Sequence, residues 1–88
     1  GECEKAILCC GTGIGISITA NKVKGIRCAL CPEPLSAKMT RLHNDANMLA
    51  MGAALIGINM AKEITDTFLD TPFSGDERHQ KRIDLIEG

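Results

Sequence analysis

The sequence predicts an α/β fold in which a parallel sheet carries helices on both faces, and three observations support this class. Apolar runs of strand length alternate along the chain with segments of helical periodicity. The connections between them are short, and no linker, repeat or low-complexity segment interrupts them. The apolar runs are continuous, as in strands that are buried on both faces. Alternation of this kind forms parallel sheets with right-handed crossovers.

The first unit is expected to be a strand, a glycine loop and a helix. Residues 5–10 are a short apolar run that ends in Cys10, and residues 14–22 follow a helical pattern. The residues between them include three glycines that allow positive φ angles and a close approach to a ligand: Gly11, Gly13 and Gly15. Gly25 suits a carboxyl-terminal cap of this helix.

Two more strands follow in the same pattern. Residues 26–31 predict the second strand, which ends before Pro32, and residues 34–45 predict a helix. The apolar stretch at 47–54 predicts a third, buried strand. Because ligands bind at the carboxyl ends of the strands in this architecture, we expect Cys10 to lie on the ligand-binding edge.

Two further helices are expected toward the end of the sequence. Asn59 can cap the first of them, which ends at Thr71 before a proline. Ser74 and Glu77 form an S-x-x-E capping box that would open the second. Strands and helices together account for a single domain over residues 1–88.

Composition excludes several classes of protein. With 88 residues, of which 44% are hydrophobic and 24% charged, the chain suits one small globular domain. A net charge of −1 and only two aromatic residues, both Phe, argue against a nucleic-acid surface, which needs a basic field and stacking rings. No apolar run approaches the ~20 residues of a membrane-spanning helix. We therefore expect neither nucleic acid nor a membrane as a partner.

The cysteines predict a reducing, cytoplasmic environment, because they are odd in number and several lie inside apolar runs: Cys3, Cys9, Cys10, Cys28 and Cys31. Cys28 and Cys31 form a C-x-x-C, but no second cysteine pair or histidine pair completes a zinc set. Strand alternation would also point these two side chains to opposite faces. Buried strand thiols are thus favoured over metal or redox chemistry.

Cys10 is the first candidate for chemistry. A thiol beside a row of backbone N–H groups, at the start of a helix, is favoured as a thiolate and can act as a base or nucleophile. The alternative is a small buried thiol next to a tight turn that binds nothing. The glycine spacing matches neither a dinucleotide-binding loop nor a P-loop.

Two other groups are candidates for binding. His43 lies in a polar cluster just before a strand, where loop residues are often functional, although the same cluster could simply end a helix. Arg78 and Arg82 are four residues apart and could clamp a phosphate, although exposed arginines on a solvated helix face are common.

Four segments in this order decide between these alternatives: residues 7–17 around Cys10, 21–27, 43–47 and 78–82. They closely resemble the type B ribose-5-phosphate isomerases, a family that includes the galactose-6-phosphate isomerase subunits. The resemblance covers essentially the whole chain, but family members have two further strands and a helix ahead of it. It implies a three-layer αβα, Rossmann-like parallel sheet, of which this chain would hold the carboxyl-terminal strands and helices.

The resemblance implies isomerisation of an aldose phosphate through an enediolate, with no metal or organic cofactor, in a site shared by two subunits of a dimer. Cys10 would be the base that moves a proton between C1 and C2. Thr12 and His43 would assist opening of the sugar ring, and Asn44 would bind sugar oxygens. The backbone N–H groups of the turn would stabilise the oxyanion: Gly11, Gly13, Ile14 and Gly15. Arg78 and Arg82 would hold the phosphate of a substrate that is bound mainly by the partner subunit.

The chain also departs from the family pattern. One branch has a glutamate base in place of Ile14, so the cysteine branch applies here. Nothing in residues 1–5 supplies the Asp-His motif of the family's amino-terminal strand, and Ala54 stands where many members have an arginine. Three alternatives therefore remain: an isomerase of a six-carbon sugar phosphate, a sugar-phosphate-binding module without catalysis, and an inactive fragment.

Overall fold

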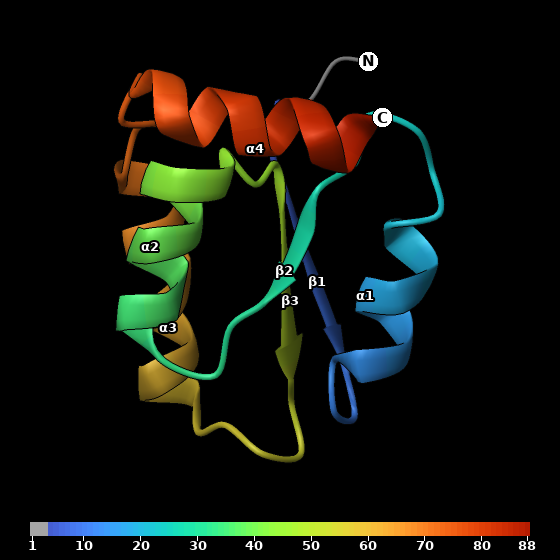
Figure 1. Ribbon diagram of the computed structural model, residues 1–88. Helices are drawn as coiled ribbons and strands as arrows, with labels where there is room; N and C mark the ends of the chain where they lie inside the picture. Colours follow the sequence, from blue (N-terminus) through green and yellow to red (C-terminus); the bar gives the residue numbers. More distant parts are fainter. Residues whose placement is uncertain (1–3) are drawn as a thin grey trace.

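In the computed structural model, which describes residues 4–88, three parallel strands form one sheet in the order β1-β3-β2 (Figure 1). The strands are β1 (Ala6–Cys10), β2 (Cys28–Leu30) and β3 (Met48–Gly52). The central strand β3 pairs in register with both neighbours, and Met48 lies opposite Ala6 on one side and Cys28 on the other. The predicted parallel sheet is confirmed, with β2 and β3 shorter than the sequence pattern indicated.

Helices cover both faces of the sheet, which confirms the three-layer arrangement. Helix α1 (Ile14–Ala20) lies on one face, and helices α2 (Pro34–Asn44) and α3 (Ile58–Asp70) lie together on the other (Figure 1). Helix α4 (Glu77–Glu87) crosses the end of the sheet where the strands begin, and it contacts α2. The core lies between β3 and the α2–α3 layer and contains Leu49, Ile64 and Phe68, each 0% exposed.

Burial on both faces holds for β3 but not for β1. Leu49 and Ala50 in β3 are fully buried, whereas Cys9 in β1 is exposed and its neighbours Ile7 and Leu8 are half-buried. The reason is position: among the described residues, β1 has a strand neighbour only on the β3 side. The expectation of a first strand buried on both faces is therefore wrong for residues 4–88.

Two predicted helix starts are each wrong by two residues. Gly57 is the N-cap of α3, so Asn59 lies within the first turn and is exposed. Asp76, not Ser74, is the N-cap of α4, because its carboxylate accepts the N–H of Arg78 at 2.8 Å. The Ser74 hydroxyl instead accepts the N–H of Asp76 at 3.2 Å.

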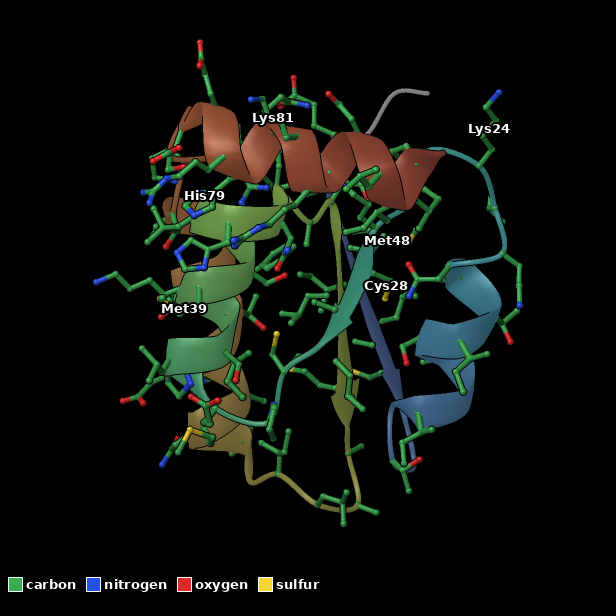
Figure 2. The ribbon with its side chains drawn as sticks, viewed as in Figure 1. Lys24, Cys28, Met39, Met48, His79 and Lys81 are labelled. Carbon is green, nitrogen blue, oxygen red and sulfur yellow. The ribbon has the colours of Figure 1, made fainter. Side chains whose placement is uncertain are left out.

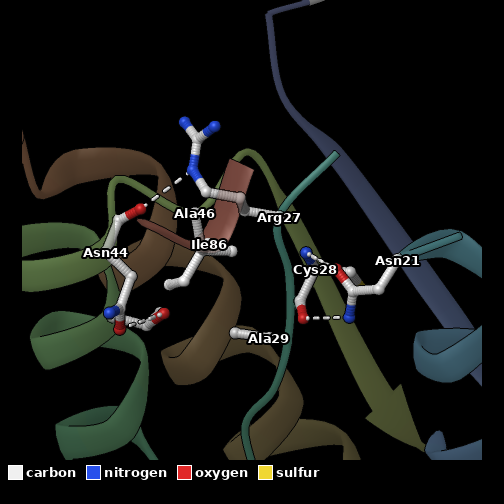
Figure 3. A pocket seen from close by; sticks show the side chains of 8 residues that line it. Asn21, Arg27, Cys28, Ala29, Asn44, Ala46 and Ile86 are labelled. Carbon is white, nitrogen blue, oxygen red and sulfur yellow. Dashed lines mark hydrogen bonds between the residues drawn. The ribbon is translucent and has the colours of Figure 1, made fainter. Parts of the chain in front are cut away.

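Helix α1 also ends earlier than expected, at Ala20, and its cap is Asn21 and not Gly25. The Asn21 carboxamide accepts the N–H of Cys28 at 2.7 Å and donates to the Cys28 carbonyl at 2.9 Å (Figure 3). This side chain thus takes the place of a neighbouring strand at the start of β2. Because unpaired strand edges recruit other chains, the pairing protects this edge of the sheet.

Candidate active site

The turn after β1 directs the Cys10 thiol. The N–H of Gly13 donates to Cys10 Sγ at 3.1 Å, and the Cys10 carbonyl accepts the N–H of Ala53 at 2.7 Å. Thr12 Oγ1 accepts the N–H of Ile14 at 3.2 Å. These bonds hold the half-buried thiol at the carboxyl end of β1, on the edge where the sequence places a ligand.

Close contacts with β3 explain the glycine at position 13. Gly13 has φ 80°, and a Cβ there would lie 2.6 Å from the Leu30 side chain and 2.9 Å from the Met51 backbone. Gly11 and Gly15 do not have positive φ, so of the three glycines that allow it only Gly13 adopts this conformation. On the β3 side, a Cβ at Gly52 would lie 2.6 Å from the Thr12 carbonyl oxygen.

We expect Gly13→Ala to destabilise the protein by about 2–4 kcal/mol, because positive φ and a clash with backbone both oppose the added methyl group. The midpoint of urea unfolding, followed by circular dichroism, measures the change. Gly15→Ala is the matched control, since a Cβ at Gly15 meets no atom within 4 Å and alanine favours the helix. Equal midpoints for the two variants would contradict this explanation.

The turn also offers donors to an anion. Two of its N–H groups are engaged within the turn, those of Gly13 and Ile14. Within the part of the chain that the structure describes, the N–H groups left for an oxyanion are those of Gly11, Thr12 and Gly15. A cavity of about 290 Å³ lies beside them, lined by Thr12, Ile14, Leu30, Pro32, Gly52, Leu55 and Ile56.

The other predicted site residues lie at the opposite end of the sheet. Helix α2 follows β2 and runs back against the strand direction, so its last residues, His43 and Asn44, lie where the strands begin (Figure 1). Helix α4, which carries Arg78 and Arg82, crosses the same end. One chain therefore places these four residues at the same end of the sheet and separates them from Cys10.

A buried arginine anchors the segment that follows His43. Arg41 is only 6% exposed, and its guanidinium donates to the Asp45 carboxylate and the Ala46 carbonyl, both at 2.8 Å, and to the Thr71 carbonyl at 2.9 Å. Asp45 has φ 46° and ends α2, so the helix-cap interpretation of this segment is confirmed. Arg41 thereby ties the turn after α2 to the end of α3.

Arg27 secures the same turn from the start of β2. Its guanidinium donates to the Asn44 carbonyl at 3.0 Å (Figure 3). It also donates to the Asp45 carbonyl at 2.9 Å and to the Glu87 carboxylate at 2.8 Å. It thus joins the ends of α2 and α4. Neither Arg27 nor Arg41 was singled out as a candidate from the sequence, because most of their partners are backbone carbonyl groups that no residue pattern reveals.

The side chain of Asn44 faces a second cavity. Asn44 Oδ1 accepts the Thr40 hydroxyl at 3.2 Å, and both residues line a space of about 310 Å³ between β2, α2 and α4 (Figure 3). Its other lining residues include Asn21, Arg27, Cys28 and Ile86. Asn44 is thus placed beside a space that could hold a polar ligand.

A second histidine, absent from the predicted site, stacks against His43. The ring centroids of His43 and His79 are 4.2 Å apart and the ring planes are tilted by 38°. His79 lies between the two predicted phosphate ligands, Arg78 and Arg82, both exposed on α4. Only its position between two arginines could have drawn attention to it, because the contact with His43 joins separate helices.

Arg78 is held in place by the cap of its own helix. Its guanidinium donates to both carboxylate oxygens of Asp76, at 3.2 and 2.9 Å. The side-chain hydrogen bond from Arg78 is the main reason that the pKa of Asp76 falls from 3.8 to about 2, and the Arg78 N–H adds to it. A guanidinium fixed in this way presents its remaining donors to an anion.

Because the pKa of Asp76 is lower in the folded than in the unfolded protein, its contribution to stability is present above pH 3.8 and is lost as the pH falls toward 2. We expect Asp76→Asn to be less stable than the wild type at about pH 5, and this difference to shrink by about pH 2. Asparagine still caps a helix, so the change tests the charge. Urea unfolding across this range measures it, with exposed Asp66→Asn as control; a gap independent of pH would contradict it.

The cysteines of the C-x-x-C are free thiols. Cys31 is buried in the core, where burial raises the pKa of its thiol to about 11, and Cys28 is half-buried in β2. This placement supports the structural interpretation of the pair. Cys3 lies outside the described residues. Over residues 4–88, no helix is long and apolar enough to cross a membrane.

Comparison with known proteins identifies relatives along nearly the whole chain. A family model described as Ribose/Galactose Isomerase matches residues 1–86. The "Putative sugar phosphate isomerase YwlF" of Bacillus subtilis is 59% identical over 98% of this chain and 57% of its own length. The "Ribose-5-phosphate isomerase B" of Escherichia coli is 50% identical over the same shares.

The fold is shared with solved structures. The type B ribose 5-phosphate isomerase of Trypanosoma brucei superimposes with a TM-score of 0.97 at 50% identity, over 99% of this chain and 58% of that one. The chain thus spans a little over half the length of the relatives that it matches. On the family match and on these identities, the chain belongs to the ribose/galactose isomerase family.

Proposed function

We propose that the full-length protein interconverts ribose 5-phosphate and ribulose 5-phosphate, with Cys10 as the base. The observation that carries the proposal is the placement of Cys10 Sγ at the carboxyl end of β1, directed by the Gly13 N–H at 3.1 Å beside further backbone donors. Family membership supports the same chemistry. A base and an oxyanion site side by side are what a proton transfer next to a carbonyl requires.

The proposed reaction begins on the open-chain aldose. The Cys10 thiolate removes the proton from C2, and the electron pair of that bond forms a C1–C2 double bond as the carbonyl pair moves to O1. N–H groups of Gly11, Thr12 and Gly15 stabilise the negative charge on O1. The proton then returns from Cys10 to C1, the proton of the C2 hydroxyl is transferred to O1, and a C2 carbonyl forms as the C1–C2 double bond is lost, which gives the ketose. No net oxidation occurs, and no further reactant is needed.

The second half of the proposed site comes from another copy of the chain. His43 and Asn44 would assist ring opening and bind sugar oxygens, and Arg78 and Arg82 would hold the phosphate. All four lie at the end of the sheet away from Cys10, so one chain cannot apply both halves to one small substrate. A homodimer that pairs the Cys10 end of one copy with the His43 end of the other supplies the complete set.

The size of the sugar is the least constrained part of the proposal. Relatives of this chain bear the names D-erythrulose-4-phosphate isomerase and galactose-6-phosphate isomerase subunit LacB, at 49% and 38% identity. The N–H of Ala54 donates to the Gly11 carbonyl at 2.9 Å, so position 54 borders the glycine turn. Alanine in place of the arginine of many family members leaves room there, and a six-carbon sugar phosphate is the second candidate.

Incubation of the full-length protein with ribose 5-phosphate in D₂O tests the function. Proton NMR should show ribulose 5-phosphate together with deuterium at the carbon that received the proton. Turnover of galactose 6-phosphate alone would favour the six-carbon alternative. Calorimetric binding of ribose 5-phosphate without turnover would favour a binding module, and the absence of both would rule out the proposed function.

A further inference from the structure

The contact between His43 and His79 joins two helices at the half-site that would act on the sugar ring. His43 belongs to the last turn of α2, and His79 to the first turn of α4. Their centroid distance of 4.2 Å and tilt of 38° describe direct ring-to-ring contact. Both rings are half-buried, and Figure 2 shows His79 at the junction of the two helices. Each ring therefore restricts the rotation of the other.

His79 is itself held from behind. The Ser74 hydroxyl and His79 Nδ1 are 2.9 Å apart and share a hydrogen bond. Ser74 is in turn attached to α2, because its N–H donates to the Leu42 carbonyl at 3.2 Å. The residue that orients His79 is thus bonded to the neighbour of His43. This closed set of contacts sets the two rings relative to one another.

We propose that His79 is a positioning residue that fixes the ring plane of His43 for opening of the sugar ring, a role that rests on the proposed function. In that step a proton leaves the C1 hydroxyl and one is added to the ring oxygen. The C1–O bond of the ring breaks, its electron pair stays on the ring oxygen, and a C1 carbonyl forms. His43 can carry out both transfers only if its ring nitrogens face the two oxygens, so its ring plane matters.

His79 acts through His43 and not on the substrate. Its Nδ1 is engaged by Ser74 and one side of its ring by His43, whereas the arginines beside it are exposed. Loss of His79 should therefore affect ring opening and leave the proton transfer at Cys10 intact, because Cys10 lies at the other end of the chain's sheet. This selectivity separates positioning from a general structural role.

The test compares a cyclic with an acyclic substrate in the full-length protein. Ribose 5-phosphate is mostly a furanose, whereas ribulose 5-phosphate cannot close such a ring, since its C5 oxygen carries the phosphate. In His79→Ala we expect kcat/KM for ribose 5-phosphate to fall about 3- to 10-fold, the effect of losing one aromatic pair. Deuterium exchange at C1 of ribulose 5-phosphate should keep its wild-type rate.

Two control variants and one NMR measurement accompany this test. His79→Phe keeps the stacked ring and should recover most of the activity, even where His79→Ala loses stability. Lys81→Ala, on the outer side of α4 in Figure 2, should match the wild type. The NMR signals of the His43 ring should shift in His79→Ala and not in Lys81→Ala, which reports on positioning without any turnover.

An equal fall of both rates, no rescue by phenylalanine, or unshifted His43 signals would overturn the role of His79. If the wild-type protein turns over neither sugar, the proposed function fails and this role fails with it. If the wild type is active and only the selectivity is missing, the proposed function stands and the role of His79 alone is wrong.

Discussion

Cys10→Ala is expected to lower kcat for ribose 5-phosphate by about 10²- to 10⁴-fold, the range for loss of a general base. The alanine removes the only group of this residue that can accept the C2 proton, while the turn around it keeps its backbone bonds to β3. The rate of isomerisation and the rate of deuterium exchange at C1 of ribulose 5-phosphate should fall by the same factor, because both depend on the same proton transfer. The Michaelis constant should change little, since the thiol adds little to ground-state binding.

Cys9→Ala is the matched control for this prediction. Cys9 is the adjacent thiol and is exposed on β1, so its loss removes the same atoms without touching the proposed site. Its kcat should equal that of the wild type. If Cys10→Ala retained most of the wild-type kcat, the base would lie at another residue, whatever the result for Cys9→Ala.

The second large effect is recovery of activity when two inactive variants are mixed. Cys10→Ala damages one half of the proposed site and His43→Ala the other, and these halves lie at opposite ends of one chain. A mixed dimer then contains one site with both lesions and one site with none. Random exchange of subunits should restore about a quarter of the wild-type activity, since half of the dimers are mixed and each has one intact site.

A mixture of Cys10→Ala with Thr12→Ala is the control, because both changes lie in the same half and every site in a mixed dimer stays damaged. Native mass spectrometry should verify that subunits have exchanged. If exchange is complete and the first mixture stays inactive, the two halves do not complement each other across copies, and the shared site is wrong.

Several features of the fold could be read from the sequence because they depend on neighbours along the chain. The apolar run before Cys10, the glycine turn and the following helical pattern predicted the first strand-turn-helix unit. Asp45 was identified as a helix end and is one. Local caps were less certain, since Ser74 and Asp76 both suit an N-cap and only the hydrogen bonds of the folded loop decide between them.

Other features depend on groups that are far apart in the sequence. The exposure of Cys9 follows from the order β1-β3-β2, which places the first strand at an edge among the described residues. Arg41 looks like a surface residue in the sequence, yet it is buried because carbonyl groups from two other segments surround its guanidinium. No residue pattern reports such backbone partners.

The sequence by itself determined the α/β class, the turn that carries Cys10 and the family of the chain, because each of these rests on the order of residues within short segments. Only the tertiary structure decided how the candidate residues are distributed. The return of α2 against the strands puts His43 at the end of the sheet away from Cys10, and the crossing of α4 puts His79 on His43. Strand order and helix packing set these distances, and both arise from contacts between segments that the chain keeps far apart.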